Sequence, residues 1–238
     1  MTIQLFPVRV KFTAANPFGN SADLKLVAIG ENGLDYAVKT GVVAASELLC
    51  YKVYQACGIG VPQYDVLEMP DKSLVFGSRI VSGVQDFGAC SPIEKLDWFK
   101  DCALVISAIC TLDFLIANDD RHQGNFLFVT GLNNRKACMA MDFSRAFLYQ
   151  QWPLPDIWVA NNNTTALVKG MRNMGFWNSS SATQSLLSAT AIEATTWIGW
   201  VESLPSDWIS TEIKIKIKDW WGDANFQQRL EQCMNEVK

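Results

Sequence analysis

The hydrophobic periodicity of the chain changes once, and this change limits the folds that the chain can adopt. Up to about residue 82, short runs of alternating apolar residues surround a single stretch with helical spacing. After residue 83, most apolar residues recur at steps of three or four, as they do on amphipathic helices. We therefore expect an α+β fold, with a strand-rich part at 1–82 and a mostly helical part at 83–238.

The first part is expected to contain five strands and one helix. The dipeptide Asn32-Gly33 separates two of the strand patterns and predicts a hairpin, because glycine supplies the positive φ that a tight turn needs. Residues 44–57 have helical spacing, and Gly58 follows them, as glycine often follows the end of a helix. Alternating apolar residues favour strands at 8–14, 24–29, 34–39, 64–69 and 74–80.

The second part combines helical patterns, short strand patterns and polar runs. Apolar spacing predicts one continuous helix over 92–117. Two short strands are expected at 126–129 and 137–141, on either side of a turn. The polar runs at 161–165 and 179–181 are predicted to be loops.

The last third of the chain is helical in pattern and rich in tryptophan. Residues 213–218 alternate isoleucine and lysine, so helix and strand both stay open there. Trp197 and Trp200 are three residues apart, and Trp220 and Trp221 are adjacent. We expect these rings to pack in the core rather than to stack on a ligand.

Composition excludes several classes of protein. The 238 residues are 49% hydrophobic and 18% charged, as in a folded globular chain. A net charge of −4 argues against direct binding of nucleic acid, which usually requires a basic surface. Seven cysteines without a Cys-x-x-Cys pair and a single histidine argue against a zinc site and favour reduced thiols in the cytoplasm. The longest apolar run is too short for a membrane span, and no signal-peptide pattern opens the chain.

The most informative segment is a polar loop at 118–125. It contains Asp120 and, five residues later, Asn125, and an apolar run then leads to Asp142 in Met-Asp-Phe. Phosphoryl transfer from Mg-ATP uses these residue types: one carboxylate orients the attacking hydroxyl or accepts its proton, and an amide oxygen and a second carboxylate hold metal ions. Protein kinases place them in H-R-D-x-x-x-x-N and D-F-G, whereas here arginine and histidine follow the first aspartate.

The strand-rich part supplies candidates for the phosphate side of such a site. Lys39 ends the pattern Tyr-Ala-Val-Lys, which is close to the V-A-I-K of kinase strands. A strand lysine that points into a cleft is a suitable charge for the α- and β-phosphates, and Glu47 in the following helix is a candidate partner for it. A solvated lysine and an exposed helical glutamate are the competing interpretations. Residues 16–22 could cover phosphates with backbone N–H groups, although a plain surface turn is favoured.

Several of these motifs resemble the HipA-like serine/threonine kinases, which are relatives of the protein kinases. The resemblance rests on Asp-Arg-His-x-x-Asn with the later Met-Asp-Phe, on the glutamate-initiated helix and Gly-x-x-x-Pro stretch at 47–62, and on the strand pattern at 74–80. It covers roughly residues 16–150. The Asp-Arg-His order is also similar to that of phosphoinositide lipid kinases. The resemblance implies a two-lobed, protein kinase-like fold, with lobes at 1–82 and 83–238.

The resemblance also implies roles for the acidic and amide residues of the second part. Asp120 would be the catalytic base, in a catalytic loop at 118–125. Asn125 and Asp142 would bind Mg²⁺ and would also count among the catalytic residues. Asp142 is followed by Phe-Ser, so serine replaces the glycine of D-F-G.

In the first part, the resemblance implies a nucleotide-binding role for five residues. Lys39 would pair with the phosphates of ATP, with Glu47 as the partner that fixes its ammonium group. Ser78 and Ile80 would border the adenine. The phosphate loop of some HipA-like kinases holds a regulatory serine, and Ser21 is the nearest candidate for it in this chain.

The expected activity is that of an ATP- and Mg²⁺-dependent kinase that phosphorylates serine or threonine of a protein. The family suggests a translation-related enzyme as the substrate, within a toxin–antitoxin system, and an antitoxin as a further partner. One alternative is a pseudokinase that binds nucleotide and regulates a partner. A second alternative is a small-molecule or lipid kinase, although the acidic pI argues against a lipid surface as substrate. Neither the target nor the oligomeric state can be deduced from the sequence.

Overall fold

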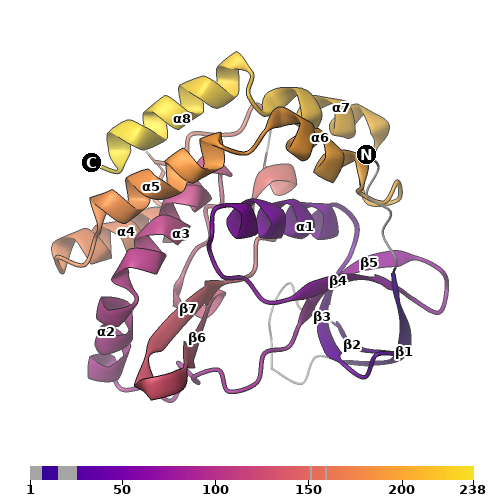
Figure 1. Ribbon diagram of the computed structural model, residues 1–238, viewed down its shortest axis with the longest axis horizontal. Coiled ribbons are helices and arrows are strands. Elements are labelled where there is room, and N and C mark those ends of the chain that lie inside the picture. Colours follow the sequence, from indigo (N-terminus) through magenta and orange to yellow (C-terminus); the bar gives the residue numbers. More distant parts are fainter. Residues whose placement is uncertain (1–6, 16–25, 151, 159) are drawn as a thin grey trace.

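A strand-rich N-terminal part precedes a helical C-terminal part, as the periodicity predicts (Figure 1). The computed structural model describes residues 7–15, 26–150, 152–158 and 160–238. The expected α+β class is therefore confirmed. Within the described residues, no helix combines the length and the apolar character that crossing a membrane requires.

One closed sheet is formed by five strands of the N-terminal part. The strands are β1 (Val8–Ala15), β2 (Leu26–Gly30), β3 (Asp35–Lys39), β4 (Tyr64–Glu68) and β5 (Leu74–Arg79). Their order around the sheet is β1-β2-β3-β5-β4. β1 pairs with β4 in parallel, and the other neighbours are antiparallel. Gly33 has a φ of 76° between β2 and β3, which confirms the predicted hairpin.

The helical part contains seven α-helices, a β-hairpin and short 3₁₀ turns among the described residues. The helices are α2 (Pro92–Asp101), α3 (Ala103–Leu115), α4 (Asn163–Asn173), α5 (Ser179–Thr190), α6 (Ala194–Glu202), α7 (Thr211–Trp220) and α8 (Ala224–Glu236). The hairpin consists of β6 (Phe126–Thr130) and β7 (Lys136–Ala140). The 3₁₀ turns are η1 (Gln123–Asn125), η2 (Leu132–Asn134) and η3 (Phe147–Tyr149).

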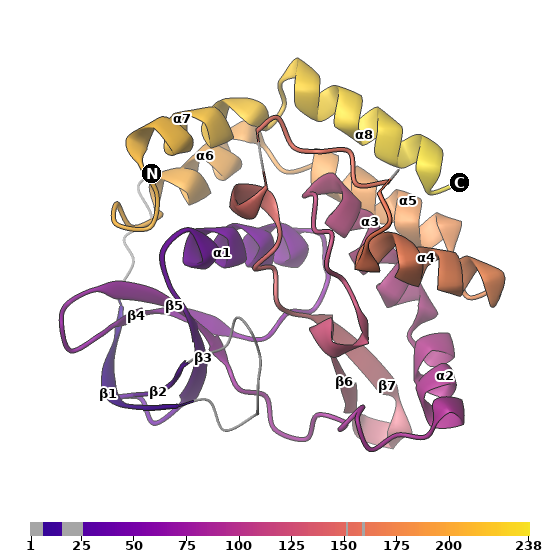
Figure 2. The ribbon, with the colours of Figure 1, turned by 180° about the vertical axis from the view of Figure 1, so that it is seen from behind.

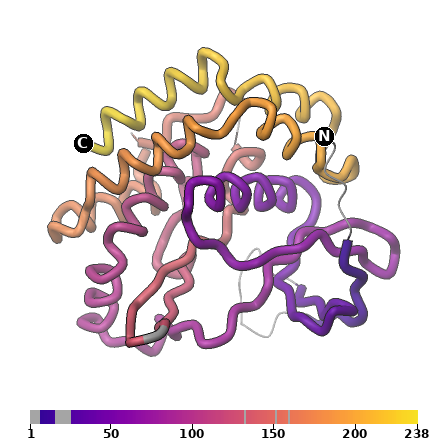
Figure 3. The backbone as a smooth tube through the Cα atoms, in the orientation of Figure 1, coloured from indigo at the N-terminus to yellow at the C-terminus, as the bar shows by residue number. Residues whose placement is uncertain are grey.

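Helix α1 (Gly41–Ala56) lies between the closed sheet and the helical part (Figures 1 and 3). It contacts β3 and β5 on one side and α5 and α6 on the other. Most of its residues from Ala44 to Tyr54 are therefore buried, as expected for a helix covered on several faces. Gly58 follows its end with a φ of 75°, in the position that the sequence predicts.

Residues 92–117 form two helices instead of the one that the apolar spacing predicts. Cys102 separates α2 from α3 with a φ of −98° and a ψ of 10°, in the bridge region between helix and strand. Buried positions continue on both sides of this residue. Periodicity alone therefore cannot detect the break, because the hydrophobic spacing passes through it.

The prediction of loops at 161–165 and 179–181 is wrong. Helices α4 and α5 begin within these polar runs. The side-chain oxygen of Asn162 accepts a hydrogen bond from the backbone N–H of Thr165 at 2.9 Å, and Asn178 caps α5 in the same way. Asparagine at an N-cap satisfies backbone donors that the first helical turn leaves free. The polar residues therefore start helices.

The ambiguous run at 213–218 belongs to helix α7. Ser210 caps this helix, and Trp220 is buried near its end. The tryptophans of the last third pack against one another, with the rings of Trp197 and Trp221 stacked at 4.5 Å between centroids. Trp197, Trp220 and Trp221 are buried, which confirms them as core, whereas Trp200 is half-buried at the edge of this cluster. All seven cysteines are free, and most of them are buried.

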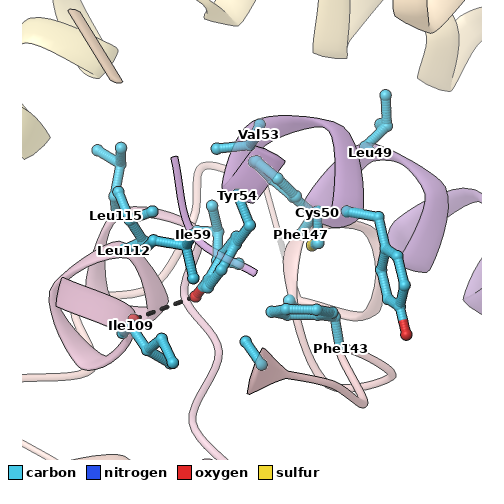
Figure 4. Packing of buried hydrophobic residues seen from close by; sticks show 14 of the residues in the cluster. Leu49, Cys50, Val53, Tyr54, Ile59, Ile109, Leu112, Leu115, Phe143 and Phe147 are labelled. Atoms are coloured by element: carbon cyan, nitrogen blue, oxygen red, sulfur yellow. Dashed lines mark hydrogen bonds between the residues drawn. The ribbon is translucent and has the colours of Figure 1, made fainter. Parts of the chain in front are cut away.

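The segment after β7 is fixed against the underside of α1 (Figure 4). The ring of Phe143 lies 4.6 Å from the ring of Tyr54, between centroids, and the Tyr54 hydroxyl donates to the carbonyl of Ile109 at 3.1 Å. The hydroxyl of Ser46 on α1 donates to the carbonyl of Phe143 at 3.2 Å. The residue before Phe143 is Asp142, so this packing fixes the backbone of a predicted metal ligand.

Candidate active site

A cavity of about 820 Å³ is lined by residues of β3, α1, β5 and the 118–125 loop. Asp120 does not line it but lies on the same loop, where its carbonyl accepts a hydrogen bond from the Asn125 side chain at 2.9 Å. Ser21 and the loop at 16–22 lie outside the described residues. The other predicted site residues all line the cavity: Lys39, Glu47, Ser78, Ile80, Asn125 and Asp142.

Lys39 contacts Asp142 rather than the predicted partner Glu47. Its ammonium nitrogen lies 3.3 Å from Oδ1 of Asp142, and the lysine side chain is only 9% exposed. Burial alone would raise the pKa of Asp142, but the Lys39 ammonium and the Ser144 hydroxyl outweigh that effect and hold the pKa below its usual range. Asp142 is therefore ionised at neutral pH and presents a negative charge to the cavity.

Glu47 is buried on α1 with one of its carboxyl oxygens unpaired. Its Oε1 accepts the backbone N–H of Phe143 at 3.0 Å, whereas Oε2 has no hydrogen-bond partner among the described residues. Burial, followed by the nearby Asp142 carboxylate, raises the pKa of Glu47 to about 8, because an incompletely bonded carboxylate is costly in the interior. Glu47 therefore positions the chain beside Asp142 without pairing with Lys39.

Two oxygen atoms on the cavity wall are suited to bind a divalent cation. Oδ2 of Asp142 accepts no hydrogen bond from the described residues, because Lys39 and Ser144 both contact Oδ1. The Asn125 amide nitrogen is used by the carbonyl of Asp120, which leaves Oδ1 of Asn125 as the second donor. Mg²⁺ prefers such oxygen ligands and usually combines one or two carboxylates with substrate phosphates. The donor set therefore fits Mg²⁺.

Arg121 connects the backbones of both predicted metal ligands. Its guanidinium is fully buried and donates to the carbonyls of Asn125 and Met141, each at 2.6 Å. Met141 directly precedes Asp142. One side chain therefore sets the spacing between the loop that carries Asn125 and the segment that carries Asp142.

Asp113 on α3 neutralises Arg121, and sequence reasoning did not identify this residue. Its two oxygens accept from Nε and Nη2 of Arg121 at 2.8 and 3.0 Å. Oδ1 also accepts the Tyr54 hydroxyl at 2.8 Å and the Asn118 side chain at 2.7 Å. The bidentate pair is entirely buried. An aspartate inside an otherwise apolar helical run was the available signal, because such a charge is rarely buried unless it is paired.

The first turn of α4 holds the 118–125 loop from the other side. The hydroxyl of Thr164 accepts the backbone N–H of Arg121 at 3.0 Å and donates to the carbonyl of Asn118 at 2.6 Å. The side chain of Asn163 donates to Oδ1 of Asp120 at 2.6 Å. α4 also contacts α3 (Figure 2). The sequence predicts a loop at 161–165 and so gives these residues no role. The spacing of Asn162 and Thr165 is nevertheless that of a capping box, which marks a helix start.

The opposite end of the cavity carries the residues expected to border a nucleobase. The hydroxyls of Tyr51 and Ser78 are 2.8 Å apart. The backbone N–H of Ile80 donates to the carbonyl of Asp35 at 2.9 Å, so this N–H is already used within the chain. Phe76 lines the same region. The wall is therefore largely apolar with a few polar groups, as in small-molecule sites.

No protein-family model matches the chain, and no curated protein matches it either. Solved structures do. The proinflammatory kinase CtkA of Helicobacter pylori is similar with a TM-score of 0.61 at 13% identity, over 97% of this chain and 98% of that one.

This chain has a kinase-like fold. A chain of the HipA, HipB and operator DNA complex of the Shewanella oneidensis MR-1 toxin–antitoxin system is also similar, with a TM-score of 0.51 at 10% identity. That match covers 89% of this chain but 59% of the other. Of what the resemblance to HipA-like kinases implies, these matches support a kinase-like fold.

Proposed function

We propose that the chain is an ATP- and Mg²⁺-dependent kinase with the two-lobed arrangement of protein kinases, and that it phosphorylates serine or threonine of a protein. The observation that carries the proposal is the convergence of Lys39, Asn125 and Asp142 on one cavity, with Asp120 on the adjoining loop. These are the residue types that phosphoryl transfer from ATP requires. Their order in the chain matches the kinase order, and the fold is kinase-like.

Each of these residues has a role that its surroundings support. Lys39 holds a charge at the cavity wall and is the proposed partner of the α- and β-phosphates. Asn125 and Asp142 are the proposed Mg²⁺ ligands. Mg²⁺, when bound there, neutralises charge on the phosphates. Glu47, with its unpaired oxygen, is the proposed partner for the Lys39 ammonium once a cation occupies Asp142.

Asp120 is the proposed acceptor of the proton from the attacking hydroxyl. As the hydroxyl oxygen bonds to the γ-phosphorus, the bond from that phosphorus to the β–γ bridging oxygen breaks and ADP leaves. The hydroxyl proton passes to the free oxygen of Asp120. The side chain of Asn163, on α4, donates a hydrogen bond to the other oxygen of this carboxylate.

A protein substrate is proposed on the resemblance of the sequence motifs to HipA-like serine/threonine kinases. CtkA is described as a proinflammatory kinase, and HipA belongs to a toxin–antitoxin system. An antitoxin partner and a translation-related substrate extend the proposal by the same resemblance. The regulatory role of Ser21 belongs to it as well.

Transfer of labelled γ-phosphate from Mg-ATP tests the proposal. The purified chain is incubated alone and with a bacterial lysate, beside the Asp120→Asn variant and the exposed control Asp97→Asn on α2. Transfer should fall about 100-fold or more in Asp120→Asn, because general-base catalysis supplies about that factor. Asp97→Asn should retain the activity of the parent.

Each result assigns a different function. Label on a lysate protein that Asp120→Asn does not produce supports a protein kinase and marks its target. Label on the chain itself supports a kinase and directs attention first to Ser21. Binding of nucleotide without any transfer contradicts the proposal and favours a regulatory pseudokinase, and transfer to a small molecule or lipid alone favours the remaining alternative.

A further inference from the structure

A residue outside the predicted motifs contacts the proposed catalytic carboxylate. Asn163 is the first residue of α4, and its side-chain amide donates to Oδ1 of Asp120 at 2.6 Å. The other oxygen of Asp120 accepts no side-chain or backbone hydrogen bond from the part of the chain that the structure describes. One oxygen is therefore held and the other is left open to a substrate hydroxyl.

The helix that carries Asn163 is itself fixed to the catalytic loop. Asn162 and Thr165 form a capping box around its first turn. Thr164 is fully buried, and its backbone N–H and its hydroxyl bond to the carbonyls of Asp119 and Asn118. Asn163 lies between these anchored residues, so its amide reaches Asp120 from a rigid support. A rigid support is what precise placement of a functional group requires.

The contact restricts the direction in which Asp120 can point. A hydrogen bond from an amide to an ionised carboxylate is stronger than one between neutral groups. Without it, a partly exposed aspartate is free to change rotamer and to turn its oxygens toward solvent. A general base works only within hydrogen-bond reach of the proton that it accepts. Loss of the contact would therefore slow the chemical step without changing the affinity for the nucleotide.

We propose that Asn163 is a positioning residue that holds Asp120 in the orientation for accepting the proton of the substrate hydroxyl; this inference rests on the kinase activity proposed above. Among the described residues, those proposed to bind ATP and Mg²⁺ form no hydrogen bond with the Asn163 side chain, which bonds to Asp120. Its removal is therefore expected to act on kcat and to spare the KM for ATP.

The test compares Asn163→Ala with Asn173→Ala, an exposed asparagine at the other end of the same helix. Asn163→Ala should lower kcat about tenfold or more, the equivalent of losing one hydrogen bond to a charged group. The KM for ATP should stay at the value of the parent, and the melting temperature should fall by no more than about 4 °C, as the loss of one hydrogen bond implies. Asn163→Asp, which places a second carboxylate beside Asp120, should lower kcat further, and Asn173→Ala should behave like the parent.

Three results would overturn the inference. One is a kcat for Asn163→Ala within about twofold of the parent, since the expected loss is larger. A second is a fall in kcat that comes with a higher KM for ATP or with a fall in the melting temperature of more than about 4 °C, which would indicate a general structural role. In the Asp120→Asn background, Asn163→Ala should cause no further loss, and an equal further loss would also contradict positioning through Asp120.

A double-mutant cycle separates failure of this inference from failure of the proposed function. The free energies of unfolding of Asp120→Ala, Asn163→Ala and the double variant are measured without substrate. Contacting residues give non-additive effects, whereas independent ones add. If the parent transfers no phosphate, the kinase proposal fails on that result, and non-additivity still supports the Asn163–Asp120 contact. Additive effects would overturn the positioning role whether or not the parent is active.

Discussion

The two sides of the cavity are held together in different ways. On the loop side, a buried guanidinium joins Asp113 to the carbonyls of Asn125 and Met141 through four hydrogen bonds. On the strand side, Lys39 reaches Asp142 through a single contact of 3.3 Å, and Glu47 keeps an unpaired oxygen. Among the described residues, Oδ1 of Asn118 is unpaired on the loop side as well, but there the buried ion pair is bonded on both partners, whereas the ion pair on the strand side rests on one contact.

This difference indicates which side is built to stay in place and which is built to exchange partners. A buried network that is fully bonded fixes one geometry, and breaking any member of it is costly. A lysine with one ionic contact can move to a phosphate while a cation takes its place at Asp142. The loop side thus sets the spacing of the proposed metal ligands, and the strand side adapts to the nucleotide.

The largest expected effect is on stability and comes from the loop side. Asp113→Ala leaves the Arg121 guanidinium buried without its partner and should lower the free energy of unfolding by about 3–5 kcal/mol. Urea denaturation measures this change. The control is Asp101→Ala, which breaks the more exposed pair with Lys136 and should cost less than about 1 kcal/mol. Similar costs for the two variants would show that the loop side is no better connected than the surface.

On the strand side, Lys39→Met should act on nucleotide binding more than on stability. Removal of the ammonium takes away a charge-assisted contact to the phosphates, and the Kd for Mg-ATP should rise by about tenfold to a hundredfold. Loss of the ion pair should also raise the pKa of Asp142, which the lysine now helps to depress. Calorimetric titration of Mg-ATP measures the affinity. An unchanged Kd would show that Lys39 does not contribute to the binding of Mg-ATP.

Glu47 predicts how stability depends on pH. Its pKa is about 8 in the folded chain, against an ordinary value of 4.5, so the folded state holds a proton that the unfolded state releases. This contribution to the free energy of unfolding is fully present below about pH 4.5 and is lost as the pH rises to about 8, at up to about 1.4 kcal/mol per pH unit.

Glu47→Gln should remove that loss, so the variant should become more stable relative to the parent between about pH 5 and pH 8. Urea midpoints across this range measure the effect. Glu231→Gln, an exposed site on α8, should leave the pH dependence of the parent unchanged. Parallel curves for the parent and Glu47→Gln would show that Glu47 titrates normally.

The smallest effect is expected from Tyr51→Phe. The substitution removes the hydrogen bond between the Tyr51 and Ser78 hydroxyls but keeps the ring contacts with Phe76 and Phe143. It should change the free energy of unfolding by about 1 kcal/mol, as measured by thermal or urea denaturation. If Tyr51→Phe lowered the free energy of unfolding as much as Asp113→Ala does, the two sides of the cavity would not differ in how firmly they are held.

The sequence predicts the strands of the N-terminal part better than the helices of the C-terminal part. Alternation and the Asn32-Gly33 turn identify β2 and β3 closely, because local patterns and turn chemistry decide strands and hairpins. The break at Cys102 and the start of α4 depend on backbone geometry and capping, which apolar spacing does not record. Helix or strand at 213–218 is decided by packing in the helical part.

For the candidate site, spacing finds the residues that face the ligand but not those that hold them. Lys39, Asn125 and Asp142 stand in recognisable motifs and do line one cavity. Asp113 and Asn163 lie far from those motifs in the chain, and only the fold brings them to Arg121 and Asp120. The partner of Lys39 could not be predicted either. Both Glu47 and Asp142 are candidates in the sequence, and only the folded positions of their carboxylates show that Asp142 is the partner.

The most direct test of the account is whether ATP binding depends on Mg²⁺ through Asp142. Affinity for ATP is measured with and without Mg²⁺ for the parent, for Asp142→Asn and for the exposed control Asp156→Asn. The account predicts that Mg²⁺ tightens binding to the parent and to Asp156→Asn, and that Asp142→Asn loses this tightening. Equal tightening in all three proteins, or no binding of ATP by the parent, would contradict it.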